Sequence, residues 1–105
     1  MNTLEGNKLI HTWLGRSWET DYKNKSADLL YHTSWDWLMP VVEKIENELD
    51  LGISVVIKNN KCGIYRYKGS VYEKCLSIFE SDTKITATIL AIIEFINWHN
   101  QITKQ

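Results

Sequence analysis

A chain of 105 residues with a formal net charge of −1 is the size of one domain and has room for one hydrophobic core. Twelve basic against thirteen acidic residues give no electrostatic case for direct DNA binding or for an anionic membrane surface. The longest apolar run, Ile89–Ile93, is too short to span a bilayer, and Met1–Asn7 lacks the pattern of a signal peptide. We therefore expect a single cytoplasmic domain over residues 1–105, with its two cysteines reduced.

The first expected element is a short amphipathic helix over Leu4–Leu14. Its apolar face consists of Leu9, Ile10, Trp13 and Leu14. Gly15 follows where a residue in the left-handed conformation would end the helix. The next stretch, Arg16–His32, has no regular period, and a connection of this length inside a small domain is often functional.

The clearest pattern predicts a helix over Thr33–Asp50. Its apolar stripe consists of Trp37, Leu38, Val41, Val42, Ile45 and Leu49. Thr33 and Asp36 have the spacing of a capping box at the helix start. Pro40 removes one backbone hydrogen bond inside the helix, so we expect a kink there. A helix that begins only at Pro40 is the alternative, but it would leave the Thr33 cap unused.

Three strands are expected in the second half of the chain. Ile53–Lys58 alternates and is β-branched, Asn59–Asn60 supplies a turn, and Cys62–Lys68 returns as the second strand. Tyr72–Phe79 alternates again, and a third strand would stabilise an otherwise marginal hairpin.

The last expected element is a helix over Asp82–Lys104, with Asp82 as its N-cap and isoleucines at helical spacing. Together these elements predict an α+β domain. A short antiparallel sheet of about three strands packs with amphipathic helices as a helix–sheet–helix sandwich.

The order of these elements resembles a known family. The chain has a helix, an aromatic loop, the segment Tyr31-His32-Thr33-Ser34-Trp35-Asp36, a helix ending Val41-Val42-Glu43-Lys44-Ile45, a hairpin, and a last helix containing Glu94–Trp98. In this it is similar to the phage ABA-sandwich domain, carried by bacteriophages and prophages. The resemblance implies a phage origin and the sandwich architecture. It implies no reaction and transfers no catalytic residue.

The residues that carry metal and acid–base chemistry are scattered. His11, His32, His99, Cys62 and Cys75 occur singly and without ligand spacing, so no metal or other cofactor is expected. Both cysteines lie in expected strands, where a buried and inert thiol is the usual interpretation.

Possible catalytic pairs have simpler interpretations. His32 could pair with Thr33 or Ser34 as base and nucleophile, but these hydroxyls are better explained as helix caps. Glu43, Glu46 and Glu48 fall on the solvated side of one helix. The sequence therefore predicts a protein that is not an enzyme.

Aromatic residues give the remaining signal. The candidate binding residues are Arg16, Trp18, Tyr31, His32 and Trp35, because aromatic rings stack on bases or anchor protein interfaces and the basic groups could meet a phosphate. The alternative is that some of these rings are core, above all Trp37 and also Tyr31. Trp35 points away from Trp37 on the helix and is expected to be the more exposed ring.

These observations lead to two functional hypotheses. The first is a non-enzymatic bacteriophage accessory protein that blocks a host protein, in counter-defence or host takeover, in the cytoplasm of the infected bacterium and as a possible homo-oligomer. The alternative is a sponge that sequesters a small linear or cyclic nucleotide in a pocket between subunits.

Overall fold

The computed structural model describes residues 3–15, 29–49 and 51–103, and the side chains from residue 5 onward. Within these residues the elements are α1 (Thr3–Trp13), α3 (Trp35–Glu43), the π-helical turn η2 (Lys44–Glu48), β1 (Ile53–Lys58), β2 (Lys61–Lys68), β3 (Val71–Glu80) and α4 (Lys84–Thr103). The expected α+β class with a three-stranded antiparallel sheet is confirmed.

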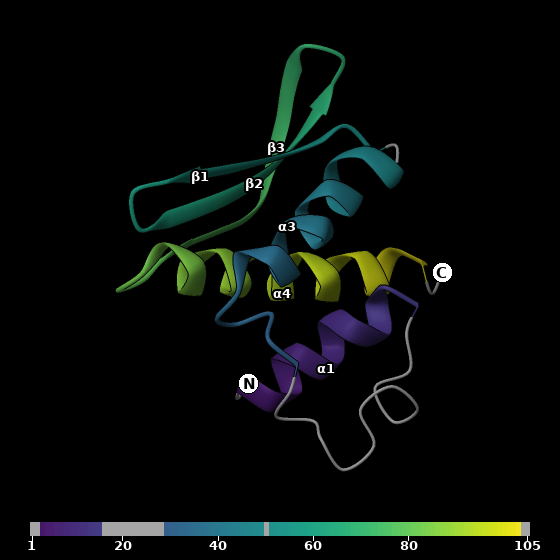
Figure 1. Ribbon diagram of the computed structural model, residues 1–105. Coiled ribbons are helices and arrows are strands. Elements are labelled where there is room, and N and C mark those ends of the chain that lie inside the picture. Colours follow the sequence, from purple (N-terminus) through teal and green to yellow (C-terminus); the bar gives the residue numbers. More distant parts are fainter. Residues whose placement is uncertain (1–2, 16–28, 50, 104–105) are drawn as a thin grey trace.

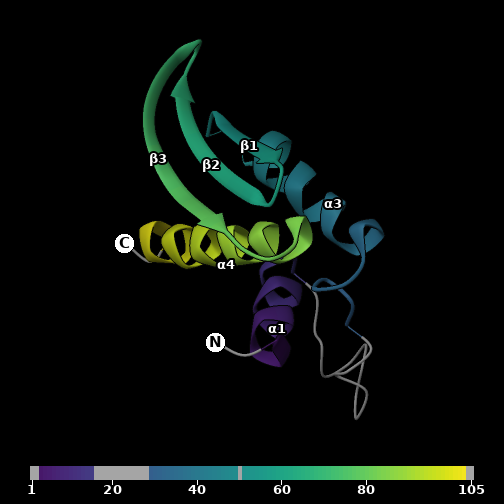
Figure 2. The same ribbon diagram turned by 90° about the vertical axis from the view of Figure 1, so that its left-hand side faces the viewer.

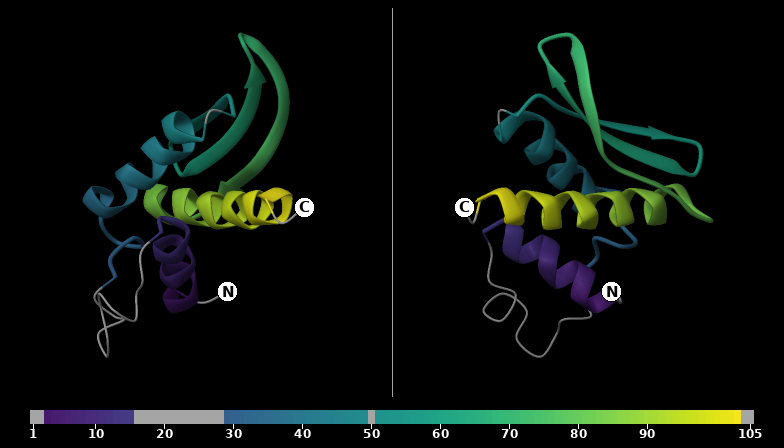
Figure 3. Two further views of the ribbon diagram at one scale, coloured as in Figure 1. Left: turned by 90° about the vertical axis from the view of Figure 1, so that its right-hand side faces the viewer. Right: turned by 180° about the vertical axis from the view of Figure 1, so that it is seen from behind.

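The long helix α4 lies at the centre of the fold. The sheet lies on one side of it and α1 on the other (Figure 1), an arrangement that is also clear from behind (Figure 3). The helices α1 and α4 approach closely at Gly6: a Cβ there would sit 2.8 Å from Cδ1 of Ile93, so a larger residue would require the end of the Ile93 side chain to shift. Burial of α4 on both sides explains its apolar sequence: Ala87, Thr88, Ile89, Ala91, Ile92, Phe95 and Ile96 are all buried.

The sheet has the order β1-β2-β3, with each strand antiparallel to the next. A two-residue turn joins β1 to β2, and Asn59 adopts the predicted left-handed conformation with φ 55°. Two irregularities in the pairing of β2 with β3, at Ile64/Tyr65 and at Arg66/Tyr67, bend these strands. As a result the far end of the β2–β3 hairpin extends clear of the helices (Figure 2).

The sheet is covered on one face. Ile53, Cys62 and Ile64 are buried there in one core cluster with residues of α3, η2 and α4. Ser77 of β3 is also buried, and its hydroxyl donates to the carbonyl of Ala91 in α4 at 2.9 Å. The helices before and after the sheet thus both pack against this one face, and the order helix, sheet, helix along the chain is the predicted one.

The expected start of the second helix is wrong by two residues. The helix begins at Trp35, and its N-cap is Ser34, whose side chain makes no capping hydrogen bond. Thr33 instead closes a turn with its backbone N–H donated to the carbonyl of Leu30 at 3.1 Å, so no capping box forms. The alternative start at Pro40 is also wrong, because Pro40 lies inside α3. The kink expected at Pro40 remains a prediction.

Two smaller expectations need correction. The last helix begins at Lys84 rather than Asp82, because the Thr83 hydroxyl accepts the backbone N–H of Thr86 at 3.2 Å and acts as the cap. Cys62 is a buried thiol as expected, but Cys75 is exposed. Burial raises the pKa of the Cys62 thiol to about 11, partly opposed by a hydrogen bond with Thr88, so this thiol is unreactive at neutral pH.

Candidate binding groove

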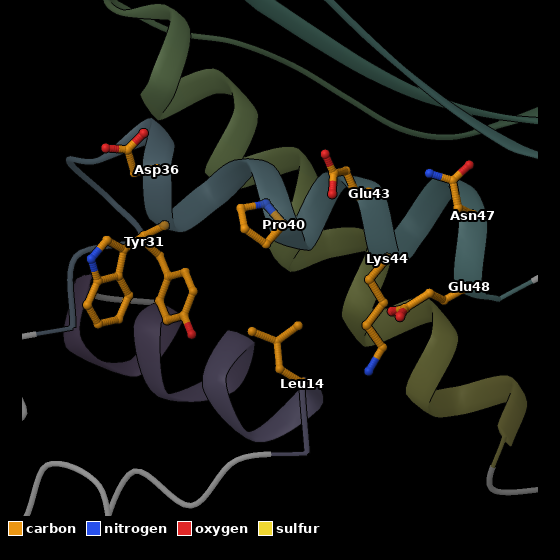
Figure 4. Close-up of a pocket in the computed structure, with 9 residues that line it drawn as sticks. Leu14, Tyr31, Asp36, Pro40, Glu43, Lys44, Asn47 and Glu48 are labelled. Atoms are coloured by element: carbon orange, nitrogen blue, oxygen red, sulfur yellow. The ribbon is translucent and has the colours of Figure 1, made fainter.

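A groove of about 720 Å³ runs along the side of α3 and η2 and faces the end of α1. It is lined by Leu14, Tyr31, Asp36, Trp37, Pro40, Glu43, Lys44, Asn47 and Glu48. Figure 4 shows Pro40, Lys44 and Glu48 along the helix, with Leu14 opposite them. The volume lies in the range of pockets that hold small molecules or one or two anchoring side chains of a protein partner.

One end of the groove is aromatic. The rings of Tyr31 and Trp37 meet edge to face with their centres 5.1 Å apart. Tyr31 is only 1% exposed, and a hydrogen bond of 2.8 Å joins its hydroxyl to Nδ1 of the buried His11. Tyr31 is therefore part of the core and supports the groove wall from behind. The half-buried ring of Trp37 is the one that a ligand can reach.

Lys44 bridges the groove to the core. Its ammonium group donates to the backbone carbonyl of Trp13 at 3.2 Å and lies 4.7 Å from the centre of the Trp13 ring. The Trp13 indole N–H in turn donates to Nδ1 of His99 at 3.1 Å, and the His99 ring stacks on Phe95. Burial and the nearby Lys44 charge lower the pKa of His99, which favours the neutral ring that can accept this hydrogen bond.

The charge of the groove is negative. Asp36, Glu43 and Glu48 contribute three exposed carboxylates and Lys44 one positive charge, so the described lining has a formal charge of −2. The Lys44 ammonium already has two partners in Trp13. A polyanionic ligand would bring its phosphates toward these carboxylates, whereas a cationic group would be attracted.

The residues predicted to form the binding site separate in the structure. Arg16 and Trp18 lie outside the described residues. Nδ1 of His32 accepts a hydrogen bond of 2.9 Å from the side-chain amide of the buried Asn7, so His32 fixes the loop to α1. Trp35 is half-buried and packs against the core. Of the three candidates that lie within the described residues, only Tyr31 lines the groove.

The groove is also lined by Trp37, Pro40, Lys44 and Glu48, which are not among the predicted site residues, although the sequence holds a signal for them. These positions recur every three or four residues and form one side of a helix. We interpreted the polar ones as an ordinary solvated face and Trp37 as core. Only the position of α1 shows that this side of the helix is one wall of a groove.

Among the described residues, no helix has the length and apolar character needed to cross a bilayer. In the same part of the chain, no three potential metal ligands come together. Comparisons with protein-family models, with curated proteins and with solved structures find no match for this chain.

Proposed function

We propose that this protein is a non-enzymatic bacteriophage accessory protein that binds a host protein through the groove along α3 and η2. The observation that carries the proposal is the pairing of an accessible aromatic ring, Trp37, with a rim of three carboxylates. Hot spots of protein interfaces usually consist of an aromatic anchor with charged groups around it. The negative rim favours a partner segment that carries Lys or Arg next to an apolar side chain.

The same charges disfavour the nucleotide sponge at this groove. A nucleotide needs cations for its phosphates, and Lys44, the one cation among the described lining residues, is held by the ring and carbonyl of Trp13. Catalysis is disfavoured as well. An acid–base mechanism needs two groups in different environments, while Asp36, Glu43 and Glu48 are all exposed side chains on one helical segment.

The test is a pull-down from bacterial lysate with three forms of the chain. The wild type is compared with the groove variant Glu43→Lys/Glu48→Lys and with the control variant Asp82→Lys/Glu94→Lys. The control makes the same change of charge at exposed residues that do not line the groove. We expect a host protein that binds the wild type and the control, and that loses at least about tenfold in affinity with the groove variant.

A second arm addresses the alternative. The melting temperature of the wild type is measured with a panel of mononucleotides and cyclic oligonucleotides. Stabilisation by one of these, with intact nucleotide recovered after denaturation, would replace the proposal with the sponge, and recovery of altered nucleotide would show an enzyme. A captured protein that binds the groove variant as well as the wild type would also reject the groove as the interface.

A further inference from the structure

The sheet has a second accessible surface, on the face turned away from the helices. Side chains alternate between the faces of a strand, so Lys61, Tyr65 and Ile78, next to the buried Cys62, Ile64 and Ser77, point outward. Large apolar side chains are exposed here: Val56 is 46% exposed and Ile78 51%. They lie in one row on either side of Gly63, and exposed apolar side chains that gather on one face can mark an interaction site.

Three tyrosines form a cluster at one end of this face. The ring of Tyr72 lies 5.9 Å from that of Tyr67 and 6.2 Å from that of Tyr65, measured between ring centres. The Tyr65 ring covers Gly63, where any Cβ would collide with it. The absence of a side chain at position 63 thus lets the Tyr65 ring lie against the sheet. Tyr72 remains 54% exposed, so the cluster (Tyr65, Tyr67 and Tyr72) is open to a partner.

The register gives the order of side chains along the outer face. From the β1–β2 turn toward the far end of the hairpin, the successive rows are Lys58, Lys61 and Glu80; then Val56, Gly63 and Ile78; then Ser54, Tyr65 and Cys75; then Tyr67 and Tyr72. Charged side chains therefore occupy one end, apolar ones the centre, and tyrosines the other end.

We propose that this outer face binds a second copy of the chain, sheet to sheet, about a two-fold axis that crosses the strands. Such an axis reverses the order of the rows. The Lys61 ammonium of each copy then faces the tyrosine cluster of the other, and the Glu80 carboxylate faces a tyrosine hydroxyl. At the centre, Val56 and Ile78 of each copy then face the row of Ser54, Tyr65 and Cys75 of the other. The face is thus complementary to itself, as an isologous interface requires.

Other arrangements are less favourable. An axis parallel to the strands would place Lys58 and Lys61 against the same lysines of the second copy, and like charges repel. Single-stranded nucleic acid also stacks on exposed tyrosines. However, the charged row contains Glu80 beside its two lysines, and the central Val56 and Ile78 offer nothing to a phosphate backbone.

The size of the face limits the strength of this dimer. Four rows, each two residues apart along the strands, cover about 27 Å, and three strands cover about 14 Å, from the usual spacings in a sheet. This area is smaller than the surface that each partner buries in a typical stable interface, about 800 Å². We therefore expect a weak dimer in equilibrium with monomer. The dimer does not use the groove, so it does not depend on the proposed function.

The test is sedimentation equilibrium of the full chain from about 10 μM to about 1 mM, a range suited to weak association. We expect concentration-dependent dimerisation of the wild type. Ile78→Lys places a charge at the centre of the interface and Lys61→Glu removes the cation that faces the tyrosines. Each variant should raise the dissociation constant at least about tenfold. Lys84→Glu makes the same charge change at an exposed position in α4 and should leave the dissociation constant unchanged.

Circular dichroism and thermal melting of each variant check that the fold is retained, which is expected because Ile78 and Lys61 are exposed. A wild type that stays monomeric over the whole range overturns the proposal. So does a dimer with the same dissociation constant in a folded Ile78→Lys variant. Binding of a fluorescent single-stranded oligonucleotide that is lost in Tyr72→Ala, with no dimer, would assign the face to nucleic acid instead.

Discussion

The molecule contains two aromatic clusters that differ in the burial of their tyrosines: Tyr31 is 1% exposed and Tyr72 54%. Beside the groove, Tyr31 packs on Trp37, and its hydroxyl shares a hydrogen bond with a buried histidine. On the outer face of the sheet, Tyr65, Tyr67 and Tyr72 pack mainly on one another and on Gly63. Burial of a tyrosine requires a partner for its hydroxyl, and the first cluster has one in His11. The difference shows that an aromatic cluster stabilises the fold where its polar atoms find buried partners, and is available for binding where they do not.

The sharpest test of this comparison is truncation of one tyrosine from each cluster. Tyr31→Ala should lower the free energy of unfolding by about 3–5 kcal/mol, because it leaves a large cavity and removes the buried hydrogen bond between the Tyr31 hydroxyl and His11. Tyr72→Ala should lower it by less than about 1 kcal/mol, because the side chain is more than half exposed. Urea denaturation measures both. Equal losses would show that the two clusters do not differ in this way.

The alternation of β1 and β2 was sufficient to predict the sheet, because each strand has one buried face and the period of two identifies it. The left-handed conformation of Gly15, with φ 82°, was predicted as well. A glycine directly after a helical pattern is enough to indicate it, because glycine adopts positive φ without steric cost. The sequence does not decide whether Tyr31 is a core residue or a binding residue. Its burial depends on a hydrogen bond to His11, twenty positions earlier, which no local pattern reports.

Glu46 is a clearer case of what the sequence could not reveal. The helical period predicts that Glu46 lies on the solvated side of its helix. In the structure its carboxylate instead accepts the backbone N–H of Val55 at 3.0 Å. Val55 lies on β1, an outer strand of the sheet, and one of its backbone groups is thereby satisfied by η2. This contact exists only because η2 runs along β1. The helical period alone cannot give that position.

A substitution at Glu46 tests how firmly the groove helix is fixed to the sheet. Glu46→Ala should lower the free energy of unfolding by about 1–2 kcal/mol, because it removes a charge-assisted hydrogen bond from a partly buried N–H group. Hydrogen exchange at the Val55 amide should become faster. Glu46→Gln keeps an acceptor and should lose less, and Glu43→Ala, at an exposed position of α3, should change little. Unchanged exchange at Val55 in Glu46→Ala would contradict the contact.

The smallest expected effect concerns pH and the core behind the groove. The pKa of His99 is lowered in the folded chain by burial and by Lys44, so the unfolded chain binds a proton at His99 more readily than the folded one. The stability that comes from neutral His99 is therefore complete above its unfolded pKa of about 6.5, and it is lost as the pH falls below that value toward the folded pKa.

In His99→Phe, the ring contacts with Phe95 and Trp13 can persist while the titrating group is gone. The decrease in melting temperature between pH 7 and pH 5 should consequently be smaller in His99→Phe than in the wild type. Tyr72→Ala, which changes only the outer face of the sheet, should keep the wild-type pH dependence. If His99→Phe and the wild type lose stability in parallel, protonation of His99 does not weaken the contact that joins Lys44 and the groove to the core.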